Sequence, residues 1–171
     1  TRQSVPAVRI SKLVPLLLLI WLLALSRGAV AQLEFEGAPI NYATAAVNDP
    51  VAVLQNKLDG GEAALKWDDQ HGWLPSVLEQ LNVPQSSQLL VFSKTSLQLR
   101  RIMPSRPRAL YFNDETYIGW VQRGDVVEVS TVDPEQGAIF YTLKQQITDS
   151  PTFVRDRGQC LICHASSRTK G

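Results

Sequence analysis

The fold is decided by residues 109–143, ALYFNDETYIGWVQRGDVVEVSTVDPEQGAIFYTL, in which short apolar runs alternate with turn residues. The runs are rich in β-branched and aromatic residues, which strands favour. They cover residues 109–112, 117–122, 126–132 and 138–143. Turn residues separate them, namely Asn113-Asp114, Gly124-Asp125 and the segment from Asp133-Pro134 to Gly137. The pattern predicts an antiparallel meander of about four strands.

Two helices are predicted before the meander. The first begins at Asp49-Pro50, because Asp is a good N-cap and Pro is favoured at the first helical position. Apolar residues follow at helical spacing, and Gly60-Gly61 ends the run. A second helix is predicted over residues 74–81. Residues 88–92 form a short strand candidate between this helix and the meander.

The beginning of the chain has the order of a secretory signal peptide. Basic residues come first, then an apolar run over residues 13–25, and then the small residues 29–31 before Gln32. The basic residues are Arg2, Arg9 and Lys12. We therefore expect cleavage after Ala31 and an exported, periplasmic protein with no stable membrane anchor after cleavage. Because 13 apolar residues are few for a membrane span, an uncleaved anchor is the weaker alternative.

Charge excludes one class of function. The chain holds 17 basic and 16 acidic residues, and four of the basic residues but no acidic one lie in the first 31. The remainder has 13 basic and 16 acidic residues, a net charge of −3. A mildly acidic domain offers no basic field to nucleic acid, so no nucleic-acid partner is expected.

One motif carries chemistry. Residues 160–164 have the sequence CLICH, which is the C-x-x-C-H attachment signature of c-type haem. On a helical turn, two thiols with this spacing can form thioethers with the two vinyl groups at one porphyrin edge, and the next imidazole can ligate the iron. The sequence predicts one covalent haem c, with Cys160 and Cys163 as thioether residues and His164 as the proximal iron ligand.

Three other uses of the cysteines compete with haem attachment. A disulfide between Cys160 and Cys163 would close a very small loop and stabilise little, although an oxidising compartment favours disulfides. A thioredoxin-like pair needs a fold that continues well past the motif, whereas seven residues follow His164. A structural zinc site needs four ligands and would have to add His71 and a carboxylate.

The second axial ligand of the iron is left open. The chain has one other histidine, His71, in a polar loop-like segment, and one methionine, Met103. A lone methionine is usually a packing residue, and neither side chain is assigned as a ligand.

Met103 lies among four arginines, Arg100, Arg101, Arg106 and Arg108. This basic cluster is interpreted as solvated loop or strand-edge charge, with pairing to haem propionates or docking of an acidic redox partner as the alternative.

Several stretches resemble a known family. They are residues 86–96, residues 107–114 with Tyr117 and residues 119–121, Asp133-Pro134 with Gly137 and residues 140–143, and the haem motif with Ser166. Together these stretches resemble a family of exported bacterial proteins described only as cytochrome c domain-containing, of planctomycete-like type. The resemblance covers roughly residues 48–171 and implies haem attachment by Cys160, Cys163 and His164, without a defined reaction. It also implies that this chain is a C-terminally truncated fragment and that a distal ligand could lie in the missing part.

The expected organisation is an α+β chain with N-terminal helices, an antiparallel meander and a C-terminal haem c attachment segment. The parts are a signal peptide (1–31), a connector (32–48), an α+β domain (49–148) and the start of the attachment segment (149–171). The expected function is electron transfer by an exported haem protein to or from an unidentified redox partner protein. Two alternatives stay open: a peroxidase-like haem oxidoreductase with an open distal site, and a non-haem interaction domain with a Cys160–Cys163 disulfide.

Overall fold

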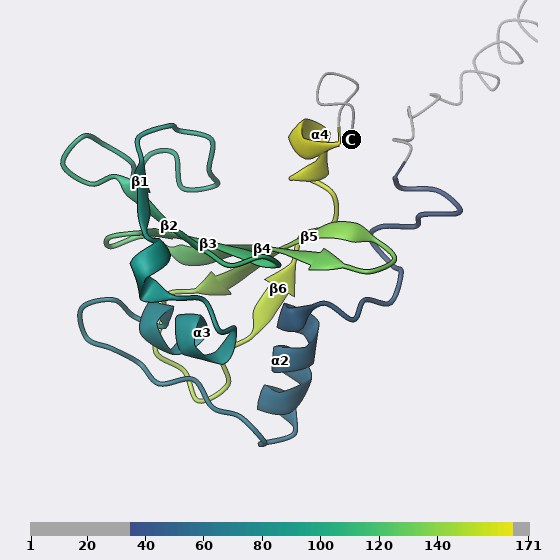
Figure 1. The fold of residues 1–171 in the computed structure, drawn as a ribbon, viewed down its shortest axis with the longest axis horizontal. Coiled ribbons are helices and arrows are strands. Elements are labelled where there is room, and N and C mark those ends of the chain that lie inside the picture. Colours follow the sequence, from purple (N-terminus) through teal and green to yellow (C-terminus); the bar gives the residue numbers. More distant parts are fainter. Residues whose placement is uncertain (1–34, 166–171) are drawn as a thin grey trace, which may run out of the picture. The chain divides into compact units, whose positions relative to one another are not determined.

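A computed structural model describes residues 35–165 of the chain. Its centre is an antiparallel sheet of six strands in sequential order (Figure 1). The strands are β1 (Leu89–Val91), β2 (Arg108–Phe112), β3 (Thr116–Val121), β4 (Val126–Asp133), β5 (Gly137–Lys144) and β6 (Phe153–Arg155). The predicted α+β class and meander are confirmed, and the five predicted strands match β1 to β5 to within one residue at each end. β6 was not predicted, because it lies in the polar segment after residue 148, where no longer apolar run marks a strand.

The turns of the meander are fixed by the residues that predicted them. Asn113 Oδ1 accepts hydrogen bonds from the N–H groups of Glu115 (3.0 Å) and Thr116 (2.8 Å). Asp133 Oδ1 accepts from the N–H groups that follow it in the β4–β5 turn, at 2.9 and 2.8 Å. Gly137 has a φ of +74°, a left-handed conformation that glycine adopts without a steric penalty.

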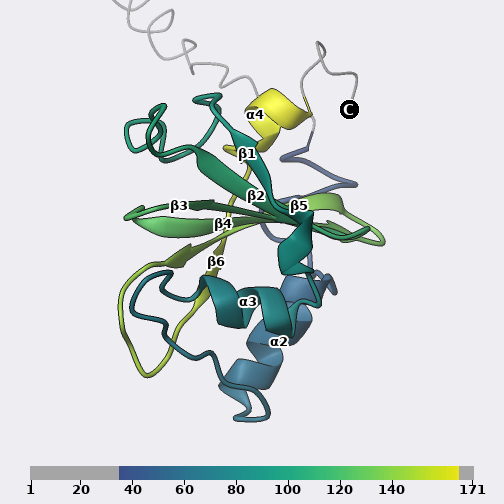
Figure 2. The same cartoon turned by 60° about the vertical axis from the view of Figure 1, so that its left-hand side comes forward.

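Both predicted helices are present. α2 (Pro50–Asp59) begins with Asp49 as its N-cap, whose carboxylate accepts from the N–H groups of Val51 (2.9 Å) and Ala52 (3.1 Å). α3 (Leu74–Gln80) agrees with the predicted helix over residues 74–81, and the short 3₁₀ helix η2 (Gln85–Ser87) follows it. Figures 1 and 2 show α2 and α3 on the same side of the sheet. Among the described residues, no helix has the length and apolar character needed to cross a membrane.

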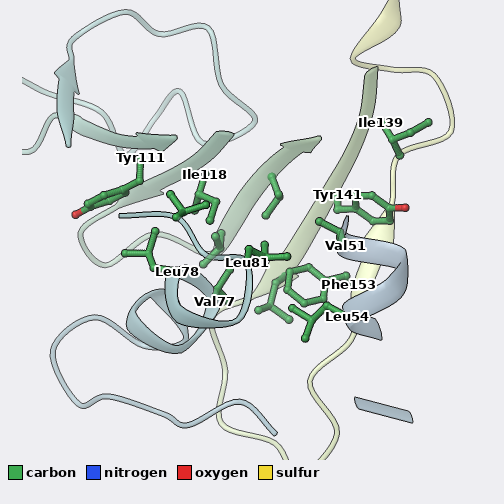
Figure 3. Close-up of a cluster of buried hydrophobic side chains, with 14 of the residues drawn as sticks. Val51, Leu54, Val77, Leu78, Leu81, Tyr111, Ile118, Ile139, Tyr141 and Phe153 are labelled. Carbon is green, nitrogen blue, oxygen red and sulfur yellow. The ribbon is translucent and has the colours of Figure 1, made fainter. Parts of the chain in front are cut away.

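The hydrophobic core lies between these two helices and one face of the sheet (Figure 3). Alternate residues of each strand point to the core, and Ile118 and Ile139 are fully buried there against helix residues such as Val51 and Val77. At full burial an aliphatic side chain of this size stabilises the fold by roughly 1.5–3 kcal/mol. Residues 35–48 form turns and add two further buried rings to this core, Phe35 and Tyr42.

The opposite side of the sheet, which we call the outer face, carries no long helix among the described residues. The short helix α4 (Leu161–His164) lies on this side, away from α2 and α3 (Figures 1 and 2). The β1–β2 connection also reaches the outer face, because Ser96 Oγ and the N–H of Leu97 each donate a 2.8 Å hydrogen bond to Glu128 on β4. The fold therefore places the haem motif against the face that α2 and α3 leave uncovered.

Candidate functional site

The three motif residues form one helical turn. The N–H groups of Cys163 and His164 donate to the carbonyl oxygen of Cys160 at 3.2 and 3.0 Å. This geometry brings residues three and four positions apart to one side of the helix. The structure therefore brings all three predicted site residues together, with the helical turn that thioether attachment at one porphyrin edge requires.

The turn is anchored by residues that the motif itself did not reveal. The Asp156 carboxylate accepts from the N–H groups of Gly158 (2.9 Å) and Cys160 (3.1 Å), and the N–H of Asp156 donates to the Phe140 carbonyl of β5 (2.8 Å). Leu161 is buried in the core cluster at 8% exposure. These contacts tie the start of α4 to the edge of the sheet, so the motif has a defined position.

Gly158 allows the chain to approach the core closely. Its φ is +114°, and a Cβ added there would lie 2.7 Å from Cε2 of Phe35. A side chain at this position would therefore both strain the backbone and collide with a core ring. Glycine is the residue that permits the chain to turn from β6 into α4 here.

The two cysteines lie in different surroundings. Cys163 is exposed, whereas Cys160 is partly buried beside the sheet, and the structure has no disulfide between them. Burial, followed by the negative charges of Asp156 and Glu128, raises the pKa of Cys160 from 9.0 to about 11. Cysteines that exchange disulfides have lowered pKa values, so the shift at Cys160 is opposite to the one that thioredoxin-like chemistry uses.

His164 lies on the outer face against an aromatic ring. The centroids of its imidazole and of the Phe140 ring on β5 are 5.1 Å apart, with the planes tilted by 44°. The imidazole is at the end of α4 and is exposed. The sequence did not predict this neighbour, because Phe140 is 24 residues away and reaches α4 through the sheet register.

The chemistry of the turn fits haem c. Two thiols and one imidazole are the groups that covalent attachment and proximal ligation use. Across residues 35–165, by contrast, no group of three or more His, Cys, Asp or Glu side chains is placed to hold a metal ion, so the described part offers no four-ligand zinc site.

The two candidate axial ligands have other contacts. His71 Nδ1 is 2.9 Å from Asp68 Oδ1, and its ring lies 5.5 Å from that of Trp120. Trp120 pairs with the buried Ala109 and lies on the core face of β3, so His71 is on the helix side of the sheet. Phe140 pairs with Ser130 on the opposite face, so His164 is on the outer side. The sulfur of Met103 accepts from Arg106 at 3.8 Å in the β1–β2 connection.

Two members of the predicted basic cluster form ion pairs. Arg101 pairs with Asp125 at the surface (2.7 Å), and Arg108 pairs with Glu128 on the outer face (2.8 Å). The Arg108–Glu128 pair is largely buried and also binds the β1–β2 connection, since Arg108 donates to the Thr95 carbonyl oxygen (3.0 Å). The sequence interpretation of solvated charge thus fits Arg101, whereas Arg108 is a partly buried structural residue.

Glu128 itself was not singled out from the sequence. It is 9% exposed and accepts hydrogen bonds from Ser96, Leu97 and Arg108. The sequence did contain a signal for Glu128: an acidic residue that alternates with apolar ones in residues 126–132 belongs to the outer face of the strand.

We compared the chain with models of protein families, with curated proteins and with solved structures, and none of them matches it.

Proposed function

We propose that this chain is an exported c-type haem protein that takes part in electron transfer. The observation that carries the proposal is the single helical turn that brings Cys160, Cys163 and His164 together on the outer face. Bound haem would supply a one-electron ferric–ferrous couple. Cys160 and Cys163 would hold the macrocycle through two thioethers, and His164 would provide the proximal imidazole.

The described residues support this proposal in a second way. α4 is joined to the sheet by the Asp156 hydrogen bonds and by Leu161, so the motif has a defined position on the fold. A defined position would keep a bound cofactor at one place for a docked redox partner. The proposal includes export with cleavage after Ala31. It also includes a redox partner protein with which the haem would exchange electrons. The signal sequence that predicts export lies outside the described residues.

The proposal is tested by making the protein in a strain that exports it and contains c-type haem attachment machinery. We expect the intact mass to exceed that of the apoprotein by one haem, and the haem to stay with the protein in acid acetone. Release of all haem by acid acetone, or no gain in mass, would contradict the proposal.

Matched variants separate ligation from folding. His164→Ala should sharply reduce the yield of holoprotein or leave high-spin iron, since the proximal imidazole is missing. His71→Ala is the control, because His71 lies on the other side of the sheet and outside the attachment turn. A His164→Ala protein with normal yield and an unchanged low-spin spectrum would remove His164 as the ligand.

A further inference from the structure

The outer face of the sheet carries a row of side chains that leads to α4. In the strand register Phe112 pairs with Tyr117, Tyr117 with Ser130, and Ser130 with Phe140. Paired residues of neighbouring antiparallel strands point to the same side, so these four form one line across β2, β3, β4 and β5. We call Phe112, Tyr117, Ser130 and Phe140 the outer-face row.

Two of the three aromatic side chains of the outer-face row are open to solvent, and the third, Phe140, is partly buried. Phe112 is 40% exposed and Tyr117 is 52% exposed. Their rings stack with centroids 5.8 Å apart and an interplanar angle of 19°. The neighbouring outer-face residue Val132 is 52% exposed. Exposed apolar side chains gathered on one face are typical of a surface that binds another group.

α4 lies at one end of the outer-face row. His164 contacts Phe140, the last member of the row. The same residue also holds the start of α4 through its backbone: the Phe140 carbonyl accepts from the N–H of Asp156 (2.8 Å), and the Asp156 carboxylate accepts from the N–H of Cys160 (3.1 Å). α4 is therefore tied to this end of the outer-face row by a ring contact and by a chain of hydrogen bonds.

We propose that the outer-face row is the binding surface for the haem that Cys160 and Cys163 hold. The inference rests on the proposed function and adds which residues would contact the macrocycle: Phe140 beside α4, then Ser130, then Tyr117 and Phe112. Three steps between strands, each about 4.8 Å, place Phe112 and Phe140 roughly 14 Å apart. This span is comparable to the width of a porphyrin, and Ser130 between the aromatic residues has a small side chain.

A tethered occupant is favoured over a free one. Haem bonded to α4 is already next to Phe140, so its effective concentration at the row is far above that of a second protein. Its apolar ring also matches the exposed phenyl and phenol surfaces, because removing apolar area from water is favourable. A second copy of the chain, or a protein partner, would cover the same residues without using the position of α4.

The test uses holoprotein carrying Tyr117→Ala or Phe112→Ala. Both side chains are exposed, so the variants should fold, as far-UV circular dichroism would show. Ile147→Ala is the matched control: Ile147 is 73% exposed in the β5–β6 connection, next to Gln146, which accepts a hydrogen bond from Trp73 on the helix side. Intact mass is recorded for every sample, followed by the Soret circular dichroism and the reduction potential.

We expect all three variants to gain the mass of one haem. Tyr117→Ala and Phe112→Ala should lower the reduction potential and change the Soret dichroism, because water then reaches the haem and stabilises the ferric state. Ile147→Ala should leave both unchanged. If the reduction potential and Soret dichroism of both row variants equal those of the control, the inference is wrong and the proposed function still stands. The same conclusion follows if the wild-type protein is a dimer that the row variants dissociate. Absence of covalent haem in the wild-type protein would overturn the proposed function itself.

Discussion

At the residue scale, Cys160 and Cys163 differ although they share one motif. The thiol of Cys160 is partly buried, close to Asp156 and Glu128, and these surroundings raise its pKa to about 11. Cys163 is exposed at the surface of α4. Since the thiolate is the reactive form of cysteine, the two should be distinguishable chemically in the apoprotein.

We predict that iodoacetamide at pH 8 alkylates Cys163 of the apoprotein faster than Cys160. Asp156→Asn should speed the reaction at Cys160, because it removes a negative charge near the thiol while keeping an acceptor oxygen, and each unit by which the pKa falls raises the thiolate fraction about tenfold. Peptide mass spectrometry over time measures both rates. The control is Asp59→Asn at the end of α2, which should change neither rate. Equal rates at the two cysteines would show that Cys160 is not protected.

At the element scale, α2 is joined to the sheet by a buried carboxylate. Asp49 is 0% exposed, caps α2 and accepts a 2.6 Å hydrogen bond from the Tyr141 hydroxyl of β5. The sequence predicted the cap, because Asp before Pro is a local signal. The bond to Tyr141 spans 92 residues and depends on the sheet register.

Asp49→Ala should lower the free energy of unfolding by about 2–4 kcal/mol. Loss of an N-cap costs about 1 kcal/mol, and a buried hydroxyl left without its acceptor costs roughly a further 1–3 kcal/mol. Urea denaturation measures the change. Asp49→Asn, which keeps a capping oxygen, should cost less, and Asp59→Ala in the exposed last turn of α2 should cost less than about 0.5 kcal/mol. Equal losses for Asp49→Ala and Asp59→Ala would refute the buried link.

The connection from β6 to α4 depends on Gly158. Comparison with Gly137, which also has a positive φ, separates the contact with Phe35 from backbone strain. Gly158→Ala should loosen α4, since the added methyl group meets Phe35, and should therefore make Cys160 of the apoprotein react faster with iodoacetamide. Gly137→Ala is the matched control: φ there is +74°, but nothing lies within 4 Å of the added Cβ. It should cost about 1–2 kcal/mol in global stability and leave Cys160 protected. Unchanged protection in Gly158→Ala would show that Phe35 does not hold α4 in place.

At the scale of the whole molecule, three buried or partly buried acids are stabilised in their neutral forms. Burial raises the pKa of Cys160 from 9.0 to about 11 and that of Tyr42 from 10.0 to about 12. Burial and the Asp49 carboxylate also raise the pKa of Tyr141 above its ordinary value of 10.0. At alkaline pH the folded protein therefore retains protons that the unfolded chain has lost. In the pH range where the folded state binds more protons, the free energy of unfolding falls as pH rises.

We predict that the stability of the apoprotein is constant from neutral pH to about pH 9 and then declines as pH rises through the folded pKa of Cys160, near 11. Urea denaturation at a series of pH values measures the decline. Cys160→Ser, whose hydroxyl does not titrate in this range, should reduce the loss between pH 9 and 11, whereas Cys163→Ser should leave it as in the wild type. Stability that does not change between pH 8 and 11 would refute the prediction.

The sequence by itself determined the elements whose signals are local. Alternation and turn residues predicted β2 to β5, and Asp49-Pro50 predicted the start of α2, because a strand face or a helix cap depends on residues a few positions apart. The spacing in residues 160–164 likewise predicted the haem motif and its helical turn, and the turn is present as α4. The haem itself and the export of the chain remain predictions.

Only the tertiary structure decided which residues surround that motif. Phe140 meets His164, Glu128 raises the pKa of Cys160, and Phe112 and Tyr117 complete the outer-face row, all through the pairing of strands that are distant from α4 in sequence. His71 and Met103 were equally open as axial ligands in the sequence, yet His71 lies on the helix side of the sheet, across from His164. The physical reason is that local spacing sets which face of a strand a side chain occupies, whereas the packing of the whole chain sets what covers that face.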